Sequence, residues 1–396
     1  MTDRRHAVIV AARRTPVVPK NGAFRHLQTD ELAAPVFRQV LQDTGLDPSA
    51  IDQVVMGNAL YGGGNPARMA ALWAGLPVDV PALTVDTQCC AGLDAILLAA
   101  RLVESGAAGC VLAGGMESFS RAPVRMHRPL RPEDQPVPYD RPAFAPPPYG
   151  DPDLFMSAAE LARERSIPKA AQADYAVESH RKARLRQTPE IRSCELVRIP
   201  GAAVDLDPFT RVLRRETALR APVLAGNPAT GVTAATVAVE ADAAAAVLVM
   251  DQETAWRLGH HRALRIMGGV SRGSDPACPA LGPVGAVRAL CRDLNLAVET
   301  LMRIELMEAF AVQALATVSD LHLDPVRVNP GGGALARGHP IGASGAILLV
   351  RLFTDLVAIR PDAAGQRGDA ADGPAVAAIA AAGGLSCAIA VKQISS

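Results

Sequence analysis

The tetrapeptide Ala-Ile-Leu-Leu occurs twice in this chain, at residues 95–98 and again at residues 346–349. Each copy lies in an apolar segment with helical spacing, and each is followed downstream by a strand-like run that contains two glycines, at 111–116 and 380–385. Four identical letters can arise by chance in a chain rich in alanine and leucine, so the prediction rests on the matching order of both pairs. This order indicates an internal duplication, and we expect two similar α/β halves packed together.

Strand-like and helical patterns alternate in the N-terminal part of the chain. Residues 6–12 and 54–57 are short β-rich runs, whereas residues 30–45 place apolar side chains at helical spacing and stop at a glycine. A strand, a helix and a buried strand follow over residues 83–116 and form a βαβ unit. This alternation is typical of α/β folds.

The middle of the chain differs in character. Prolines crowd residues 120–153 and exclude central strands or long helices there, so we expect an excursion on the surface. Helical spacing resumes over residues 156–187, and a core strand returns only at 243–250. We therefore divide the chain into an N-terminal half (1–118), an inserted loop lobe (119–242), a return to the N-terminal half (243–265) and a C-terminal half (266–396).

The composition argues against several classes of protein. The formal net charge is +0 at pH 7 and no basic cluster is interleaved with aromatic residues, so no nucleic-acid partner is expected. Every apolar stretch of membrane-spanning length is interrupted by Gly, Pro or charge, so no membrane association is expected. The 7 cysteines show neither a disulfide framework nor the paired spacing of a zinc site. We expect free thiols, no metal and a cytoplasmic location.

Two adjacent cysteines, Cys89 and Cys90, stand just before the first apolar helix. A thiol at the start of a helix lies near unpaired backbone N–H groups and the positive end of the helix dipole, which lower its pKa. Ala91 and Gly92 are small and leave room for a carbonyl at Cys89, whereas Cys90 would point about a quarter-turn or more away. The alternative is that both are small core residues, the usual role of free cysteine. This segment alone leaves both interpretations open.

A histidine lies in the glycine-rich segment 329–345 of the C-terminal half. Dense glycines permit close backbone approach, and they place His339 between Gly338 and Pro340 on a constrained loop before a helix. A lone histidine is usually structural. This one occupies the position that mirrors the cysteine loop in the duplicated half, so the two loops can meet as a Cys–His pair.

These motifs, with others, resemble the thiolase superfamily, the acetyl-CoA acetyltransferases and 3-ketoacyl-CoA thiolases, over nearly the whole chain. The matching segments are Arg14-Thr-Pro, Met56-Gly-Asn, Asn65-Pro-Ala-Arg, Ala74-Gly-Leu-Pro, Cys89-Cys-Ala-Gly-Leu, Ala113-Gly-Gly-Met-Glu-Ser, Glu308-Ala-Phe and Gly338-His-Pro-Ile-Gly-Ala-Ser-Gly. In the family's Cys-x-Ser/Ala-Gly-Leu pattern the acyl-accepting cysteine comes first, so Cys89 matches it. The resemblance also implies a layered α/β/α/β/α core.

The resemblance implies ping-pong acyl transfer. The cysteine would take an acyl group from CoA, and the enolate of a second acetyl-CoA would attack it, or the reverse. His339 would match the activating base and also help to hold a thioester oxygen. A second oxyanion pocket would be formed by the backbone N–H groups of Cys89 and Ala382.

The resemblance places the substrate side of the site in the inserted lobe and nearby. Arg220 would help to hold the CoA nucleotide, Met156 would line the acyl pocket, and Phe310 would lie on the substrate side; Arg220 could equally be a solvated surface residue. CoA thioesters would be substrates, with no cofactor. The family implies a homodimer or homotetramer, and residues 120–153 could serve assembly or an outside partner.

Three positions depart from the family pattern. Met307 replaces an asparagine whose amide fixes a catalytic water, and Ala238 stands where we align a serine of the pantetheine loop. Ala380 replaces the second cysteine, which moves the proton to and from the enolate. Cys387, seven residues further on, would be roughly 23 Å away along a strand. Losing a positioned acid or base typically costs about 10²–10⁴-fold in rate.

Three hypotheses remain open. The first is an enzyme that still makes or cleaves a carbon–carbon bond, with another residue or the substrate itself moving the proton. The second is an acyltransferase or hydrolase that passes the Cys89 acyl group to oxygen, nitrogen or water. The third is a non-catalytic partner subunit that retains the fold.

Overall fold

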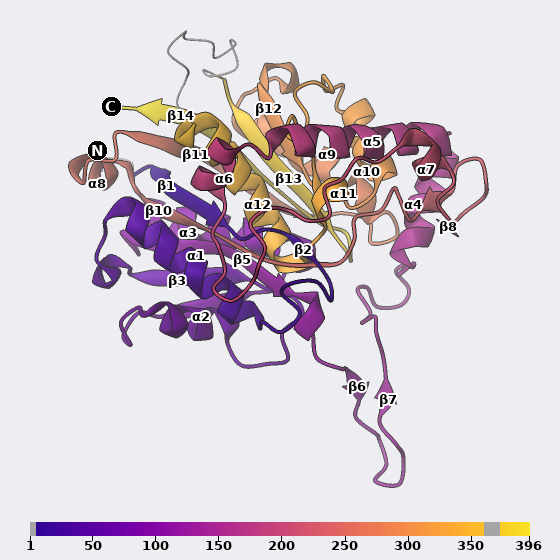
Figure 1. Ribbon diagram of the computed structural model, residues 1–396, viewed down its shortest axis with the longest axis horizontal. Helices are drawn as coiled ribbons and strands as arrows, with labels where there is room; N and C mark the ends of the chain where they lie inside the picture. The colour runs from indigo at the N-terminus through magenta and orange to yellow at the C-terminus, as the bar shows by residue number, and fades with distance from the viewer. Residues whose placement is uncertain (1–4, 360–372) are drawn as a thin grey trace.

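The chain is described here by a computed structural model that covers residues 5–359 and 373–396. Its centre is a ten-stranded sheet in the order β12-β13-β14-β11-β1-β10-β5-β3-β4, with β2 paired to β10 (Figure 1). The strands are β1 (Ala7–Arg14), β2 (Val18–Pro19), β3 (Gln53–Gly57), β4 (Ala82–Val85), β5 (Cys110–Ser118), β10 (Ala241–Asp251), β11 (Arg262–Gly273), β12 (Arg303–Leu306), β13 (Ala375–Ala381) and β14 (Leu385–Ser395).

The sheet consists of two halves with the same pattern of pairing. In the first half, β10 lies antiparallel between β1 and β5, and β3 pairs parallel to β5. In the second half, β14 lies antiparallel between β11 and β13, and β12 pairs parallel to β13. The halves join where β1 meets β11, through the pairs Val8 with Arg265 and Ile9 with Leu264. The predicted duplication and α/β class are therefore confirmed.

The two helices that contain the repeated tetrapeptide, α3 (Ala91–Ser105) and α12 (Ile341–Phe353), pack against each other at the centre of the fold. A Cβ atom at Gly92 would lie 2.5 Å from the Gly342 carbonyl oxygen, so the helices approach this closely only because that side chain is missing. Alternate residues of β10 and of β13 bury their side chains against this helix pair. The pair is thus the middle layer between the two half-sheets.

The outer faces of the half-sheets carry the remaining helix layers. Helices α1 (Thr29–Thr44) and α2 (Pro66–Ala74) share a core with the first half-sheet. Helices α9 (Gly282–Asp293) and α10 (Ala311–Asp320) do the same for the second. The result is the α/β/α/β/α layering that the resemblance implied.

The segment Ile341–Ala358, which is α12 and the turn after it, is long and apolar enough to cross a membrane by length and composition. In the fold, 83% of it is buried between the half-sheets. Burial of this extent is what a central helix of a layered α/β core requires, so we describe the segment as a core helix.

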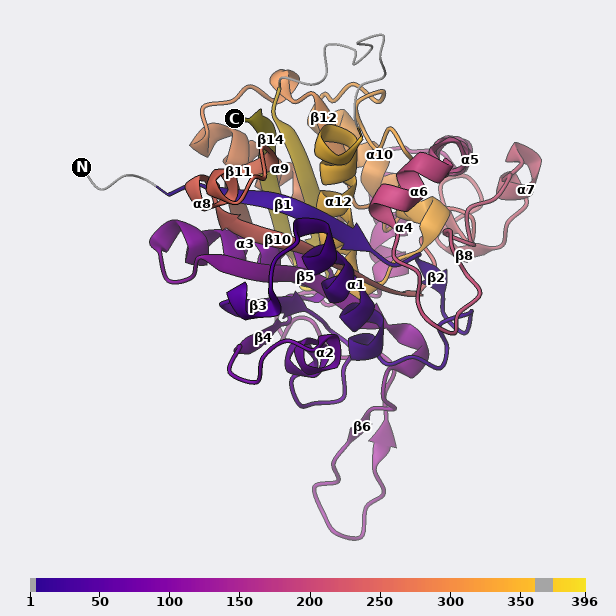
Figure 2. The ribbon, with the colours of Figure 1, turned by 60° about the vertical axis from the view of Figure 1, so that its left-hand side comes forward.

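The residues between β5 and β10 form the additional elements that cover one side of the core. A hairpin of β6 (Met126–His127) and β7 (Val137–Pro138) projects away from the body in both views (Figure 2). The other elements are α4 (Leu154–Glu164), α5 (Lys169–Arg186), α6 (Pro189–Glu195), α7 (Arg215–Leu219), β8 (Val223–Ala225) and β9 (Val232–Thr233); two short helices outside this region are α8 (Gln252–Arg257) and α11 (Ala334–Arg337).

A buried ionic network fastens these elements to the core. Glu195, at the end of α6, lies 2.7 Å from Arg14 Nε and 2.9 Å from an Arg186 nitrogen. Asp207 also pairs with Arg14, and Asp355 pairs with Arg186. Burial alone would raise the pKa of Glu195, but the neighbouring arginine charges outweigh it and hold that pKa well below its usual range. Glu195 is therefore charged in the folded protein.

We expect Glu195→Gln to lower the free energy of unfolding by about 3–5 kcal/mol, because it leaves two buried guanidinium groups without their shared carboxylate. Glu190→Gln, at an exposed position of the same helix, serves as the control. Denaturant unfolding near neutral pH measures the difference. Because the folded pKa is depressed, the contribution of Glu195 is complete above the unfolded value of about 4.3 and is lost as the pH falls. Equal unfolding midpoints at neutral pH would contradict this role.

Candidate active site

Cys89 lies in a short 3-10 turn, Gln88–Cys90, that connects β4 to α3. Gln88 has a positive φ of 54°, and the Asp86 carboxylate fixes it by accepting its backbone N–H at 2.9 Å. A Cβ atom at Gly57 would lie 2.3 Å from the backbone of Ala91, so the start of α3 rests directly on β3. This strained, tightly supported turn presents the Cys89 side chain at the start of the helix.

His339 faces Cys89 from the loop between α11 and α12. Its Nε2 lies 3.2 Å from Cys89 Sγ, and its Nδ1 lies 2.6 Å from Ser344 Oγ. The Ser344 hydroxyl itself donates to the Pro340 carbonyl at 2.9 Å, so Ser344 accepts the Nδ1 proton. We therefore assign the tautomer that leaves Nε2 free to accept from the Cys89 thiol. The predicted cysteine and histidine are brought together.

Burial keeps both members of this pair neutral. It raises the pKa of the Cys89 thiol to about 12, although backbone N–H groups of Ala382 and Cys89 act in the opposite direction. It also lowers the pKa of His339 to about 4. The expectation of a lowered thiol pKa is therefore wrong. Desolvation raises the pKa of Cys89 by more than the N–H groups and the dipole at the start of the helix lower it. In any attack by Cys89, transfer of the thiol proton to His339 would have to accompany the attack rather than precede it.

We expect no ultraviolet thiolate absorbance from Cys89 near neutral pH, because the neutral pair dominates. The measurement is a pH titration of the thiolate band in the wild type minus that in Cys89→Ser, so that the other cysteines cancel. The difference should grow only in strongly alkaline solution. A step below pH 8 that is lost in Cys89→Ser would show a resting thiolate and contradict the neutral pair.

The end of β13 passes directly beside the two cysteines. The backbone N–H of Ala382 reaches the Cys89 sulfur, which places it beside the N–H of Cys89 as the predicted oxyanion pocket requires. The Cys90 thiol points elsewhere and donates to the Ile379 carbonyl at 3.7 Å. Ala380 lies between these two contacts and is half-buried. Cys90 is fully buried and belongs to the central core.

The position expected for Cys387 is wrong. The chain turns at Gly383 and Gly384, both with positive φ, so β14 folds back along β13 and Cys387 lies opposite Ile379. Its thiol interacts with Asp94 and its backbone N–H reaches Cys90. The expected distance of roughly 23 Å between Ala380 and Cys387 applies to one continuous strand. The hairpin instead brings the two residues onto neighbouring strands. Cys387 is near Cys90 but buried in the core.

The remaining departures from the family pattern lie on segments around the His339 loop, and Met307 lines a small cavity with Gly338 and Ser344. The backbone of Ala238 donates to the Ala309 carbonyl at 3.0 Å, and the next residue, Val239, accepts the His339 N–H at 2.7 Å. Phe310 follows Ala309 in the chain. The segment that contains Ala238 and Val239 therefore contacts both the residue before Phe310 and the backbone of His339. Met307 is buried, and its N–H donates to a carbonyl of β13. Apolar side chains thus stand where the resemblance expected an amide and a hydroxyl.

The predicted substrate residues lie on the lobe side of this site. Phe155 packs edge-on against Phe310, with ring centroids 5.7 Å apart, and the adjacent Met156 is 56% exposed. Arg220 ends α7 and is exposed. It lines a cavity of about 370 Å³ together with Ala235, three residues before Ala238.

Sequence reasoning gave no role to two residues that support the site, Ser344 and Glu117. Ser344 orients His339, as described above. Glu117 is buried at the end of β5, and its carboxylate accepts from Asn58 Nδ2 at 2.7 Å and from the Gly342 N–H at the start of α12 at 3.0 Å. Burial raises its pKa to about 7, against the opposing effect of the backbone donors. Both residues stood in motifs quoted above, in Gly-Gly-Met-Glu-Ser and in Gly-His-Pro-Ile-Gly-Ala-Ser.

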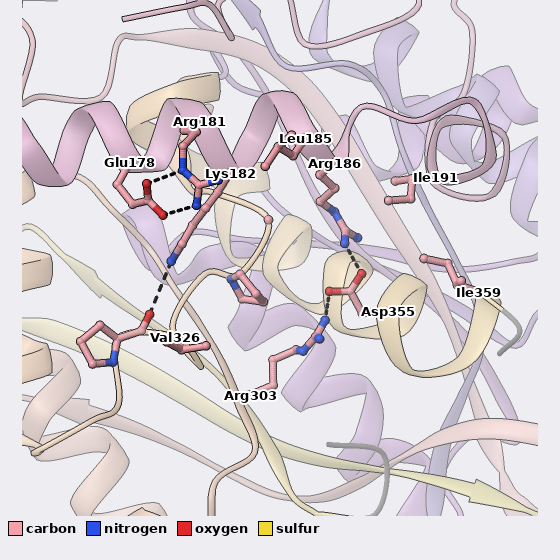
Figure 3. Close-up of a pocket in the computed structure, with 13 residues that line it drawn as sticks. Glu178, Arg181, Lys182, Leu185, Arg186, Ile191, Arg303, Val326, Asp355 and Ile359 are labelled. Atoms are coloured by element: carbon pink, nitrogen blue, oxygen red, sulfur yellow. Dashed lines mark hydrogen bonds and ion pairs between the residues drawn. The ribbon is translucent and has the colours of Figure 1, made fainter. Parts of the chain in front are cut away.

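A separate cavity of about 710 Å³ lies between α5 and the start of β12 (Figure 3). Arg186 and Arg303 point toward Asp355 at one end, and Lys182 points to a backbone carbonyl at the other. Its lining includes none of the predicted site residues. Within residues 5–359 and 373–396, no group of three or more His, Cys, Asp and Glu could hold a metal ion.

Comparison with known proteins gives consistent matches along the chain. The N-terminal domain of thiolases matches residues 7–253, and the C-terminal domain of thiolases matches residues 261–393. "Putative acetyl-CoA C-acetyltransferase VraB" of Staphylococcus aureus (strain COL) is 34% identical over 363 residues, 88% of this chain and 92% of that protein. "Putative acetyl-CoA C-acetyltransferase YhfS" of Bacillus subtilis (strain 168) is 36% identical over 388 residues, 97% of this chain and 98% of that protein.

A solved structure is similar over its full length. The crystal structure of the Bacillus anthracis acetyl-CoA acetyltransferase matches with a TM-score of 0.88 and 25% sequence identity, and the match covers 100% of both chains.

Proposed function

Because this chain belongs to the thiolase family, whose members transfer acyl groups from CoA, we propose that it forms an acyl-enzyme at Cys89 and passes the acyl group to a carbon nucleophile. The observation that carries the proposal is the contact of Cys89 Sγ with His339 Nε2 at 3.2 Å, in a tautomer that accepts the thiol proton. A non-catalytic subunit would not need this tautomer or the Ser344 bond that maintains it.

The first half-reaction follows from these contacts. Cys89 attacks the thioester carbonyl of an acyl-CoA while His339 Nε2 takes the thiol proton. The N–H groups of Cys89 and Ala382 donate to the carbonyl oxygen as it becomes an oxyanion. The bond to the CoA sulfur then breaks, and His339 returns the proton to that leaving thiolate. The Cys89 thioester remains, with His339 neutral again.

The acyl-CoA would lie across the side of the site formed by the inserted lobe. Met156 and Phe310 would face the acyl chain, and the cavity beside Arg220 would take the nucleotide end of CoA, where a guanidinium pairs well with phosphate. CoA thioesters are thus proposed as substrates, and the steps above use no cofactor.

We also propose that the chain acts in the cytoplasm as a homo-oligomer. The β6–β7 hairpin supports the homo-oligomer, because it exposes a group of apolar side chains of the kind that subunit contacts bury. These are Val124, Met126, Leu130 and Val137. Sedimentation of Leu130→Asp beside the wild type would test whether the hairpin takes part in assembly.

The experiment that tests the acyl-enzyme is intact-mass analysis after brief incubation with a panel of acyl-CoAs. We expect one adduct whose mass equals the acyl group. Failure of every acyl-CoA to label the protein would overturn the proposal. An adduct that disappears with release of free acid, and without a carbon–carbon product, would instead favour the hydrolase alternative.

A further inference from the structure

We propose that the carbon nucleophile comes from a 2-carboxyacyl-CoA, of which malonyl-CoA is the simplest, and that loss of CO₂ replaces proton abstraction in this site. The inference rests on the proposed acyl-enzyme at Cys89. The same enolate can be generated in two ways. Acetyl-CoA must lose a proton from carbon, whereas a 2-carboxyacyl-CoA obtains the electron pair when its bond to the carboxylate carbon breaks.

Removal of a carbon-bound proton needs a base beside the acyl-enzyme, and the adjacent strand does not provide one. Ala380 lies between Ile379, whose carbonyl accepts the Cys90 thiol, and Ala382, whose N–H reaches the Cys89 sulfur. This stretch of β13 is therefore within reach of the acyl group. A methyl group at Ala380 cannot accept a proton.

Most neighbouring ionisable groups are held in other contacts. Asp86, on the exposed side of the turn, accepts from the backbone N–H and the side-chain amide of Gln88 through one carboxylate oxygen. The Glu117 carboxylate, which is 1% exposed, accepts hydrogen bonds from the Asn58 amide and from three backbone N–H groups. These contacts occupy the acceptor sites that a catalytic base would need. Asp94 accepts from the Thr87 hydroxyl at 2.6 Å. Cys90, like Cys387, is fully buried behind the strand.

His339 is suited to hold an enolate oxygen rather than to take a carbon-bound proton. Burial lowers the pKa of His339 to about 4, so the imidazole is a weak base for a carbon-bound proton. If the ring gives its Nδ1 proton to solvent and takes one from solvent at Nε2, the Ser344 hydroxyl can turn from the Pro340 carbonyl and donate to Nδ1 instead. Nε2–H would then donate to the thioester oxygen of the second substrate, where negative charge develops.

The apolar departures from the family pattern are consistent with this use. Ala238 precedes Val239, whose carbonyl accepts the His339 N–H, and Met307 lines a small cavity with Gly338 and Ser344; neither side chain offers a carboxylate a hydrogen bond. A carboxylate placed among them loses hydration, whereas the transition state for decarboxylation spreads its charge toward the thioester oxygen. Apolar residues at positions 238 and 307 therefore do not impede decarboxylation, although they lack the polar groups that the family uses for deprotonation.

The second half-reaction forms the carbon–carbon bond and frees Cys89. The bond between C2 and the carboxylate breaks, CO₂ leaves, and the electron pair forms the enolate. C2 then attacks the Cys89 thioester carbonyl, the carbon–sulfur bond breaks, and a 3-ketoacyl-CoA is released. The Cys89 thiolate takes one proton from solvent, by way of His339. No carbon-bound proton is removed and no oxidant or reductant is required.

The test is a single-turnover comparison on acyl-enzyme formed beforehand at Cys89. Malonyl-CoA and acetyl-CoA are added separately, and we follow CO₂ release and 3-ketoacyl-CoA formation. We expect malonyl-CoA to react at least about 10²-fold faster, the lower bound for loss of a positioned base. In deuterated buffer, wild type should not exchange the methyl protons of acetyl-CoA.

The position of Ala380 gives a matched pair of variants. Ala380→Cys should raise the rate with acetyl-CoA and so reduce the ratio of malonyl-CoA to acetyl-CoA rates, whereas Ala380→Ser, of similar size but without a suitable pKa, should keep the ratio high. Comparable wild-type rates for the two substrates, or no CO₂ from an enzyme acylated at Cys89, would overturn this inference alone. Absence of Cys89 acylation would overturn the proposed function itself.

Discussion

Cys89→Ala is expected to abolish acylation by every acyl-CoA that labels the wild type. Among the seven cysteines, all of which lie in the described residues, Cys89 is the one whose thiol contacts both His339 Nε2 and the Ala382 N–H, the groups proposed as proton acceptor and oxyanion donor. Cys90→Ala should still be acylated, because its thiol donates to the Ile379 carbonyl inside the core. Intact mass before and after incubation measures the loss, and peptide mapping locates the adduct.

The adjacent cysteine also serves as the control for folding. Both substitutions replace a thiol by a methyl group within one turn of the chain, so unfolding midpoints of the two variants show whether lost labelling reflects chemistry or lost structure. An adduct that persists in Cys89→Ala, or maps to Cys90 in the wild type, contradicts the assignment. Because Cys90 is the more deeply buried, a stability loss is expected to be larger in Cys90→Ala.

The duplicated core was predictable because it depends on patterns that repeat along the chain. The tetrapeptide at residues 95–98 and 346–349 marks two helices with the same environment. These helices, α3 and α12, lie side by side between two half-sheets whose strands pair in the same pattern. The approach of the Cys89 and His339 loops follows from that symmetry. Each loop precedes one of the paired helices, so helices that touch at their starts bring the loops together.

The electrostatic state of the pair was not predictable from the same patterns. The position of Cys89 at a helix start suggested a low pKa, but the pKa depends on how much protein surrounds the thiol, and the surrounding atoms come from β13 and from the loop of His339. Cys387 was misplaced for a related reason. The distance between Cys387 and Ala380 depends on whether Gly383 and Gly384 reverse the chain. The number of residues between the two positions is the same for a continuous strand and for a hairpin.

His339→Ala is expected to slow acylation of Cys89 by about 10²–10⁴-fold, the usual cost of removing a positioned acid or base. The effect is large here because burial holds the thiol pKa at about 12, so attack without a nearby base must proceed through a rare thiolate. The measurement is the rate of adduct formation by rapid quench and intact mass. The slowed variant should also accelerate with rising pH, about tenfold per unit, because the thiolate population then limits the rate.

A matched variant separates the chemistry of His339 from its packing. Ser344→Ala leaves the imidazole in place but removes the acceptor of its Nδ1 proton, so it should slow acylation less than His339→Ala. Its rate should not rise tenfold per pH unit, because His339 Nε2 can still take the thiol proton. The hydrogen bond from the backbone N–H of His339 to the Val239 carbonyl is unaffected in both variants, so the loop between α11 and α12 should keep its position. If His339→Ala acylated at the wild-type rate with the same pH profile, another group would have to accept the thiol proton. The neutral Cys89–His339 pair would then be a structural contact, and the acyl-enzyme mechanism would need a different base.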